Sequence, residues 1–225
     1  MSANACTPGS EATPLRLGRR GTATATTSSY DKIRDAATAG EGDKPAKTTT
    51  IPYRNALERL WVLEPMPAWE PTGSHLNRLA SSPKHFLVDP ALAARLVGVE
   101  RDSLIFGRGP AATVRGGTFL GSLFESLAAL SLRCFAQLAG ARVLHLRTRG
   151  GLREVDFIVE RSDHRVVAFE VKLAQVVVDD DVKHLSWLRD RLGDRLLDAV
   201  VITTGAHAFR RPDGIAVVPL ALLGP

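Results

Sequence analysis

The residues with the clearest chemical potential are charged side chains inside two otherwise apolar stretches of this 225-residue chain. The first stretch reads Glu-Val-Asp-Phe from residue 154, and the second reads Phe-Glu-Val-Lys from residue 169. Burying an ionised carboxylate costs on the order of several kcal/mol unless it is paired or bound to a metal. Three acids and one lysine in apolar surroundings therefore predict a bound divalent metal ion, with a cross-strand salt bridge as the alternative.

Both stretches have the composition of β-strands, in which successive side chains point to opposite faces of the sheet. In the first strand we expect Glu154 and Asp156 on one face and Val155, Phe157 and Val159 on the other. The charged residues of this strand are therefore separated from its apolar residues.

The second strand shows the same alternation, with Glu170 and Lys172 on one face and Phe169 and Val171 opposite. If the two strands pair as a hairpin, their charged residues converge at one end of the sheet. Glu154 fits the edge of such a hairpin or an indirect role better than a ligand position.

The C-terminal half shows an α-β-β-β-α-β order that brings these strands together. It begins with a helix over residues 119–139, which has an apolar stripe and stops at Gly140. We expect strands at 142–147, 153–160 and 165–173, a helix at 181–192, and strands at 197–203 and 215–218. The strand at 165–173 is so apolar that we place it centrally, buried on both faces.

The N-terminal half shows weaker organisation. Residues 1–22 lack hydrophobic periodicity and predict a disordered lead. Residues 23–70 contain two short helical patterns and then an extended stretch, which resembles a winged helix-turn-helix unit; a helical packing module without DNA contact fits equally well. Residues 71–118 are rich in Pro, Gly and Arg, and we interpret them as a connector that packs on a C-terminal domain at 119–225.

These motifs resemble the PD-(D/E)XK nuclease superfamily, in which one strand carries an acid and the next carries D/E-X-K. Asp156 matches the first acid, and Glu170-Val171-Lys172 matches the second motif. A wider pattern, from about residue 53 to 225, resembles the uncharacterised C-terminal domain of bacterial AAA-type ATP-binding proteins. That resemblance is carried by Pro83-Lys84-His85, Asp89-Pro90, Leu123-Phe124-Glu125 and Thr203-Thr204-Gly205.

The nuclease resemblance implies a restriction-endonuclease-like α/β fold, with a mixed sheet, and specific roles. Asp156 and Glu170 would ligate Mg²⁺ or Mn²⁺, and Glu125 on the preceding helix would be a further ligand. Lys172 would orient or deprotonate the attacking water and offset charge on the phosphate. Metal-activated water would then hydrolyse a DNA phosphodiester without a covalent enzyme intermediate. The position of Glu125 on its helix also fits an ordinary solvent-facing residue.

The chain departs from the AAA-type family because the ATPase module is missing. A phosphate-binding loop needs G-x-x-x-x-G-K-[ST], but Lys47-Thr48 follows Ala46, and Glu41 stands at the first glycine position. We therefore expect no ATP site. The chain would be a fragment, a split partner of a separate ATPase protein, or a stand-alone descendant.

A net charge of +5 and a pI near 9.6 allow an anionic partner, and we expect DNA. Arg147, Arg149 and Arg153 surround the hairpin turn as candidate contacts to backbone phosphates, although a solvated turn would look the same. The rival hypothesis is a catalytically inactive nuclease-fold module that binds a partner or DNA in an AAA ATPase system. A third is a transcriptional regulator that binds DNA through residues 28–65.

The composition narrows the remaining possibilities. Hydrophobic residues make up 44% and charged residues 24%, as in ordinary soluble proteins, and no apolar run approaches the ~18 residues of a membrane span. Cys6 and Cys134 are too few for a disulfide framework, which favours a cytoplasmic location. The scattered histidines argue against zinc, and we expect no small-molecule cofactor.

Overall fold

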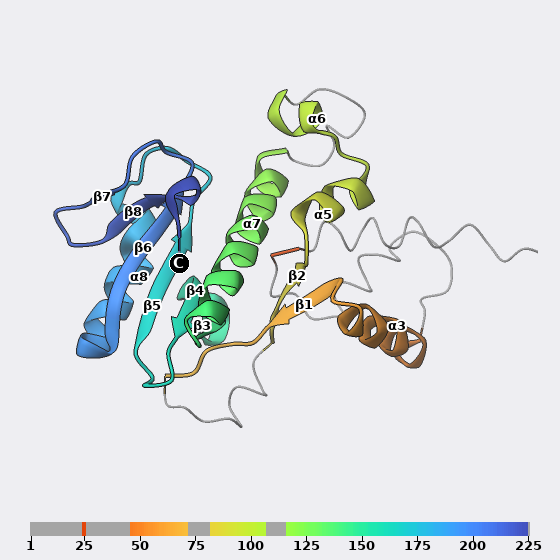
Figure 1. The fold of residues 1–225 in the computed structure, drawn as a ribbon, viewed down its shortest axis with the longest axis horizontal. Helices are drawn as coiled ribbons and strands as arrows, with labels where there is room; N and C mark the ends of the chain where they lie inside the picture. The colour runs from red at the N-terminus through yellow and green to blue at the C-terminus, as the bar shows by residue number, and fades with distance from the viewer. Residues whose placement is uncertain (1–23, 26–45, 72–81, 107–115, 225) are drawn as a thin grey trace, which may run out of the picture.

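A six-stranded mixed sheet forms the centre of the computed structural model, which describes residues 24–25, 46–71, 82–106 and 116–224 (Figure 1). The strand order is β3-β4-β5-β6-β8-β7. β3, β4 and β5 pair antiparallel, β5, β6 and β8 run parallel, and β7 is antiparallel to β8. The strands are β3 (Arg142–Arg147), β4 (Glu154–Glu160), β5 (Val166–Val171), β6 (Leu196–Thr203), β7 (Phe209–Arg210) and β8 (Ala216–Pro219).

Two helices cover opposite faces of this sheet because each presents an apolar stripe to it (Figure 1). α7 (Gly116–Leu138) packs on one face, where its buried Ala128, Ala129 and Leu132 join apolar residues of β4, β5 and β6. α8 (Asp179–Leu192) packs on the other face through a buried apolar stripe of its own. β5 therefore lies between two layers, which confirms its predicted central position.

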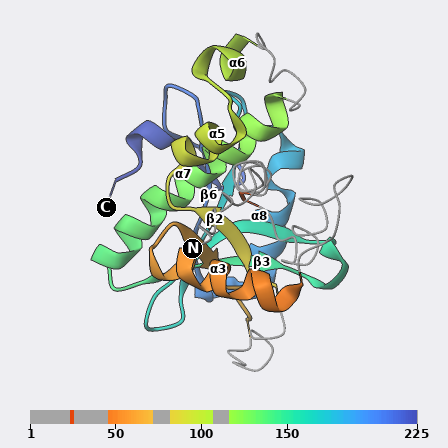
Figure 2. The ribbon, with the colours of Figure 1, turned by 90° about the vertical axis from the view of Figure 1, so that its right-hand side faces the viewer.

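The N-terminal elements lie beside α7 (Figure 2). β1 and β2 form a separate two-stranded antiparallel sheet, in which Met66 lies opposite Lys84. α5 and α6 contact α7, and α3 contacts β1. The elements of this part are α3 (Lys47–Arg59), β1 (Leu63–Met66), β2 (Lys84–Leu87), α5 (Pro90–Val97) and α6 (Arg101–Phe106). Short 3-10 turns occur at η2 (Arg149–Gly151), η3 (Gly193–Arg195) and η4 (Leu220–Leu222).

Two sets of contacts attach the small sheet to the main domain. Arg133 of α7 forms an ion pair with Glu64 of β1, and its guanidinium lies 5.4 Å from the ring centroid of Phe86 in β2. After β1, the chain follows the edge of β3, where the main-chain N–H of Trp69 donates to the His145 carbonyl at 2.6 Å. The small sheet is therefore joined to both α7 and the edge of the large sheet.

The predicted C-terminal elements are confirmed with small shifts in their bounds. β3 coincides with the expected strand at 142–147, and α7 ends two residues before Gly140, which has a φ of 62°. The structure adds β7, a two-residue strand that the sequence pattern did not indicate. With five helices and a six-stranded mixed sheet, the described part of the chain confirms the mixed α/β class.

The predictions for the N-terminal part are tested only in places. The expected lead at residues 1–22 and the helical pattern near residues 30–37 lie outside the described residues. The second predicted helix is present as α3, and the predicted connector at 71–118 contains β2, α5 and α6. The winged-helix prediction and the division at residues 22, 70 and 118 stay predictions.

Residues Phe119–Leu138 of α7 are long and apolar enough, at a mean hydropathy of 1.4, to pass a test for a membrane span. The sequence led us to expect no apolar run of this length. Glu125 and Arg133 interrupt the apolar residues of this helix, yet its average hydropathy is still high enough. Core helices of soluble proteins pass the same test, and α7 packs its apolar stripe on the sheet.

His145 of β3 is a buried imidazole, and its Nε2 lies 3.2 Å from the carbonyl oxygen of Ser82. Burial, reinforced by the positive charge of Lys84, lowers the pKa of His145 to about 4. The native ring is therefore neutral at pH 7, with its proton assigned to Nε2, where it can be donated to Ser82.

We expect His145 to destabilise the native state as the pH falls from about 6.5 to about 4. In this window the unfolded imidazole binds a proton and the folded one does not, whereas above it both are neutral. The effect of one such group is about 3 kcal/mol. Between pH 7 and pH 4, the free energy of unfolding measured by urea denaturation should therefore fall less in His145→Leu than in wild type. The difference between the two proteins should be about this amount.

The matched control is His207→Gln, which alters an exposed histidine and should leave the pH dependence unchanged. An undiminished loss in a folded His145→Leu protein would show that His145 does not titrate in this way.

Candidate functional site

Four of the predicted site residues come together at one end of β4 and β5, and a fifth charged residue, Lys84 of β2, contacts two of them. The four are Glu125, Asp156, Glu170 and Lys172. The Lys84 Nζ forms ion pairs with Glu125 of α7 and with Asp156 Oδ1 of β4, the latter at 3.1 Å. Lys172 follows β5, and its Nζ lies 3.6 Å from Glu170 Oε2. We call these five residues the charge cluster.

A β-bulge in β4 shapes this cluster. Three residue steps along β4, from Val155 to Ile158, lie opposite two steps along β3. Val155 and Ile158 consequently both pack in the α8-side core, whereas Phe157 packs in the α7-side core. The prediction that Val155 and Phe157 share a face is wrong, because the extra residue of the bulge interrupts the alternation.

Asp156 lies within this bulge, next to the point where β4 and β5 separate. The paired residues of the two strands end at Phe157 opposite Phe169. Beyond that pair, the main-chain N–H of Val171 donates to Asp156 Oδ2 at 3.0 Å, while Lys84 Nζ donates to Asp156 Oδ1. The Asp156 carboxylate thus bridges the two strands with one oxygen and holds the lysine with the other.

Lys84 is the cluster member that the sequence did not assign to the site. Its side chain is only 3% exposed. Burial opposes its positive charge, but the carboxylates of Asp156 and Glu125 outweigh burial and raise its pKa above the ordinary value. The available signal was its place in the Pro83-Lys84-His85 motif, at the start of a strand that is buried throughout. That signal indicates that Lys84 is unusual, but it does not indicate which residues it contacts.

The three acids of the cluster differ in their affinity for protons. Burial, followed by the negative charge of Asp156, raises the pKa of Glu125 to about 8. The same two causes raise the pKa of Glu170 well above its usual range. Asp156 is also buried, yet Lys84 and the Val171 N–H hold its pKa below the usual value. Negative charge in the cluster is therefore concentrated on Asp156.

The predicted phosphate contacts lie around the turn between β3 and β4. Arg147 Nη1 is 3.6 Å from Glu154 Oε2, so Glu154 pairs at the hairpin edge as expected. The Arg153 guanidinium lies 5.6 Å from the ring centroid of Trp187 in α8. Arg149 begins η2. Arg147 and Arg153 therefore each have a partner within the protein at this turn.

The donor chemistry of the cluster fits a hard divalent cation, because Glu125, Asp156 and Glu170 all offer carboxylate oxygens. The arrangement differs from a formed metal site. In the described ranges, no group of three or more His, Cys, Asp or Glu residues is placed to hold a metal ion. Two of the three predicted ligands instead contact the ammonium group of Lys84.

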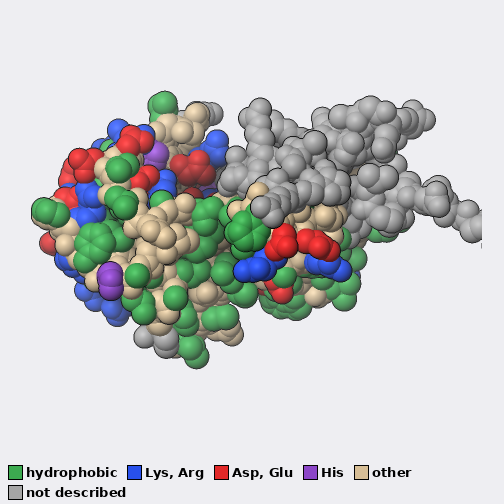
Figure 3. All heavy atoms as spheres, turned by 90° about the horizontal axis from the view of Figure 1, so that it is seen from above, with side chains coloured by type: hydrophobic (Ala, Val, Ile, Leu, Met, Phe, Trp, Pro, Cys, Tyr) green, Lys and Arg blue, Asp and Glu red, His purple; other side chains and the backbone are tan. Residues whose placement is uncertain are grey.

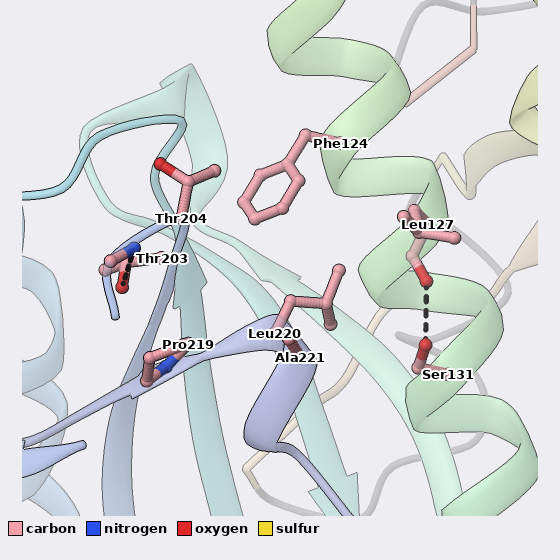
Figure 4. Close-up of a pocket in the computed structure, with 9 residues that line it drawn as sticks. Phe124, Leu127, Ser131, Thr203, Thr204, Pro219, Leu220 and Ala221 are labelled. Carbon is pink, nitrogen blue, oxygen red and sulfur yellow. Dashed lines mark hydrogen bonds between the residues drawn. The ribbon is translucent and has the colours of Figure 1, made fainter. Parts of the chain in front are cut away.

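An apolar pocket of about 390 Å³ opens on the same helix, beyond Phe124 (Figure 4). Figure 4 shows the Phe124 ring directed from α7 toward Thr204 and Leu220. Thr203 at the end of β6 and Pro219 at the end of β8 form the opposite wall. The pocket therefore lies at the carboxyl ends of parallel strands, where open α/β sheets commonly bind ligands.

Comparisons with known proteins bear on both halves of the chain. Residues 120–223 match a domain of unknown function, DUF4143, and residues 17–103 match another domain of unknown function, DUF8612. No curated protein matches the chain.

A solved structure, the refined half-complex from a tetradecameric assembly of Thermococcus gammatolerans McrB AAA+ hexamers with bound McrC, has a chain with a TM-score of 0.33 and 11% sequence identity. The alignment covers 92% of this chain and 70% of that one.

The residues of the charge cluster come from both matched ranges. Glu125, Asp156, Glu170 and Lys172 lie in the range that matches DUF4143, and Lys84 lies in the range that matches DUF8612.

Proposed function

We propose that residues 119–225 form a nuclease-type domain, with a restriction-endonuclease-like core, that hydrolyses DNA phosphodiesters with the help of a divalent metal ion. One observation carries this proposal: Glu125, Asp156 and Glu170 reach one end of the sheet from three different elements, beside Lys172. Buried acids gathered in this way are costly in a purely structural role, so they favour a cationic ligand.

The residues of the cluster would divide the work. Asp156 and Glu170, with Glu125, would hold Mg²⁺ or Mn²⁺ through carboxylate oxygens. Such an ion, when bound, polarises the scissile phosphate and lowers the pKa of a coordinated water. Lys172 is partly exposed, so its ammonium can orient the attacking water or stabilise charge on a phosphate oxygen. No covalent enzyme intermediate is needed.

DNA is the proposed substrate because its phosphates suit the basic residues beside the cluster. On the face seen in Figure 3, acidic and basic side chains are intermixed rather than separated into patches of one sign. We expect binding to use local contacts at the β3–β4 turn, from Arg147, Arg149 and Arg153.

A second candidate is a catalytically inactive nuclease-fold module that binds DNA or an ATPase partner protein. The contact between Lys84 and the carboxylates of Glu125 and Asp156 favours it, because a lysine can neutralise these acids without a metal. The two candidates differ in whether the cluster binds a divalent ion and cleaves DNA.

Asp156→Asn and Lys172→Ala should each reduce nicking of supercoiled plasmid DNA, in Mg²⁺ or Mn²⁺, by about 100-fold or more. Asp156→Asn removes the charge that a metal ligand needs, and Lys172→Ala removes the ammonium that faces the water or phosphate. The readout is the initial rate of open-circle formation on an agarose gel.

Asp163→Asn is the matched control, because this exposed acid of the β4–β5 turn pairs with the nearby Arg161 and Arg165 and lies outside the charge cluster. Thermal melts of each variant verify folding. If folded wild-type protein neither binds Mn²⁺ nor nicks DNA, the inactive module is the better candidate.

Arg147→Ala and Arg153→Ala should weaken DNA binding across unrelated sequences, because phosphate contacts do not depend on base identity. For each lost phosphate contact, the slope of log Kobs against log salt concentration should become shallower by about 0.9. Fluorescence anisotropy with a duplex at several salt concentrations measures this slope. Arg165→Ala, at the β4–β5 turn, should leave it unchanged, and an equal change there would contradict a specific role for the β3–β4 turn.

A further inference from the structure

Lys84 reaches the acids of the charge cluster from outside the large sheet and α7, the elements that carry those acids. It begins β2, opposite Met66 of β1, and its side chain runs to the end of β4. The small sheet is itself anchored on α7, through the ion pair of Glu64 with Arg133 and the contact of Arg133 with Phe86. The position of the Lys84 ammonium is therefore set by a packed element rather than by a free side chain.

The Lys84 ammonium contacts one carboxylate oxygen of each of two acids, Glu125 and Asp156, that would hold a metal ion in the proposed function. It pairs with Oε1 of Glu125 and, at 3.1 Å, with Oδ1 of Asp156. Its ammonium also lies 5.8 Å from the ring centroid of Phe157, the residue that the bulge turns toward α7. With 3% of the side chain exposed, these contacts are shielded from solvent, and a second cation at the same oxygens would be strongly repelled.

We propose that Lys84 is the resident cation of this site, and that a divalent metal ion binds by displacing the Lys84 ammonium from Glu125 and Asp156. The proposal rests on the proposed function insofar as that function requires a metal ion at these acids. In addition, Lys84 would limit the affinity of the site for metal ions, and metal binding would depend on the position of the β1–β2 sheet that carries Lys84.

Lys172 does not provide the same competition. Its ammonium lies 3.6 Å from Glu170 and 3.9 Å from Asp181, and it is 34% exposed, so it can turn toward solvent when a cation arrives. Lys84 lacks that freedom because its strand is buried at every position. Removing each lysine should therefore have different consequences for metal binding.

The test is Mn²⁺ binding to the full chain, measured by isothermal titration calorimetry at neutral pH. Lys84→Met keeps the length of the side chain but removes its charge, so the affinity for Mn²⁺ should increase by about tenfold or more. Lys84→Arg keeps the charge and should bind Mn²⁺ no more tightly than wild type. Lys183→Met, the same substitution at an exposed lysine of α8, should have no effect.

Lys84→Met leaves two buried carboxylates without their cation, so a second comparison protects the test from loss of folding. Glu125→Gln removes one of these carboxyl groups, and the double variant Glu125→Gln with Lys84→Met should bind Mn²⁺ more tightly than Glu125→Gln alone. Equal or weaker binding after loss of Lys84, in a folded protein of either background, would overturn the proposal.

The outcomes also separate this proposal from the proposed function. Tighter Mn²⁺ binding without DNA cleavage would support Lys84 as the resident cation and count against nuclease activity. Cleavage with unchanged Mn²⁺ affinity in Lys84→Met would support the nuclease and overturn the displacement of Lys84. Absence of Mn²⁺ binding in wild type and every variant would overturn both.

Discussion

The ion pairs of the Lys84 ammonium with the Glu125 and Asp156 carboxylates join parts of the chain that are far apart in sequence. The three residues come from β2, α7 and β4, and Lys84 is almost fully buried. A buried charge that loses its partner costs on the order of several kcal/mol, so these elements cannot shift independently. The small sheet, the long helix and the large sheet are therefore held together by electrostatics as well as by apolar packing.

The β4 bulge determines how the main sheet takes part in that arrangement. In a regular strand Val155 and Phe157 would lie on the same face, but the bulge places Val155 in the α8-side core and Phe157 in the α7-side core. The β4–β5 pairing ends at Phe157, and Asp156, the neighbouring residue within the bulge, accepts hydrogen bonds from the Val171 N–H and the Lys84 ammonium. Of the three cluster acids, the one within this irregularity, Asp156, has a lowered pKa, whereas Glu125 and Glu170 have raised ones.

Much of this arrangement could be predicted from the sequence because it depends on local patterns. The apolar periodicity of α7 and β5 determines which face is buried, and charged residues within apolar strands identify Asp156 and Glu170. Lys84 could not be assigned in the same way, since Asp156, its partner, is 72 residues away. The bulge was also inaccessible, because it depends on the pairing of β4 with β3 and leaves no mark in the alternation of residue types.

The two candidate functions share one physical origin. Lys84 pairs with Asp156 and Glu125, but burial and the negative charge of Asp156 still raise the pKa values of Glu125 and Glu170, so one lysine does not balance all three acids. An inactive module would resolve that deficit by keeping the two glutamates protonated. A nuclease would resolve it with a divalent ion, whose two charges exceed the single charge of the lysine. Both solutions use the carboxylate oxygens of the same acids, so the choice between the two candidates depends on whether the Lys84 ammonium can leave Glu125 and Asp156.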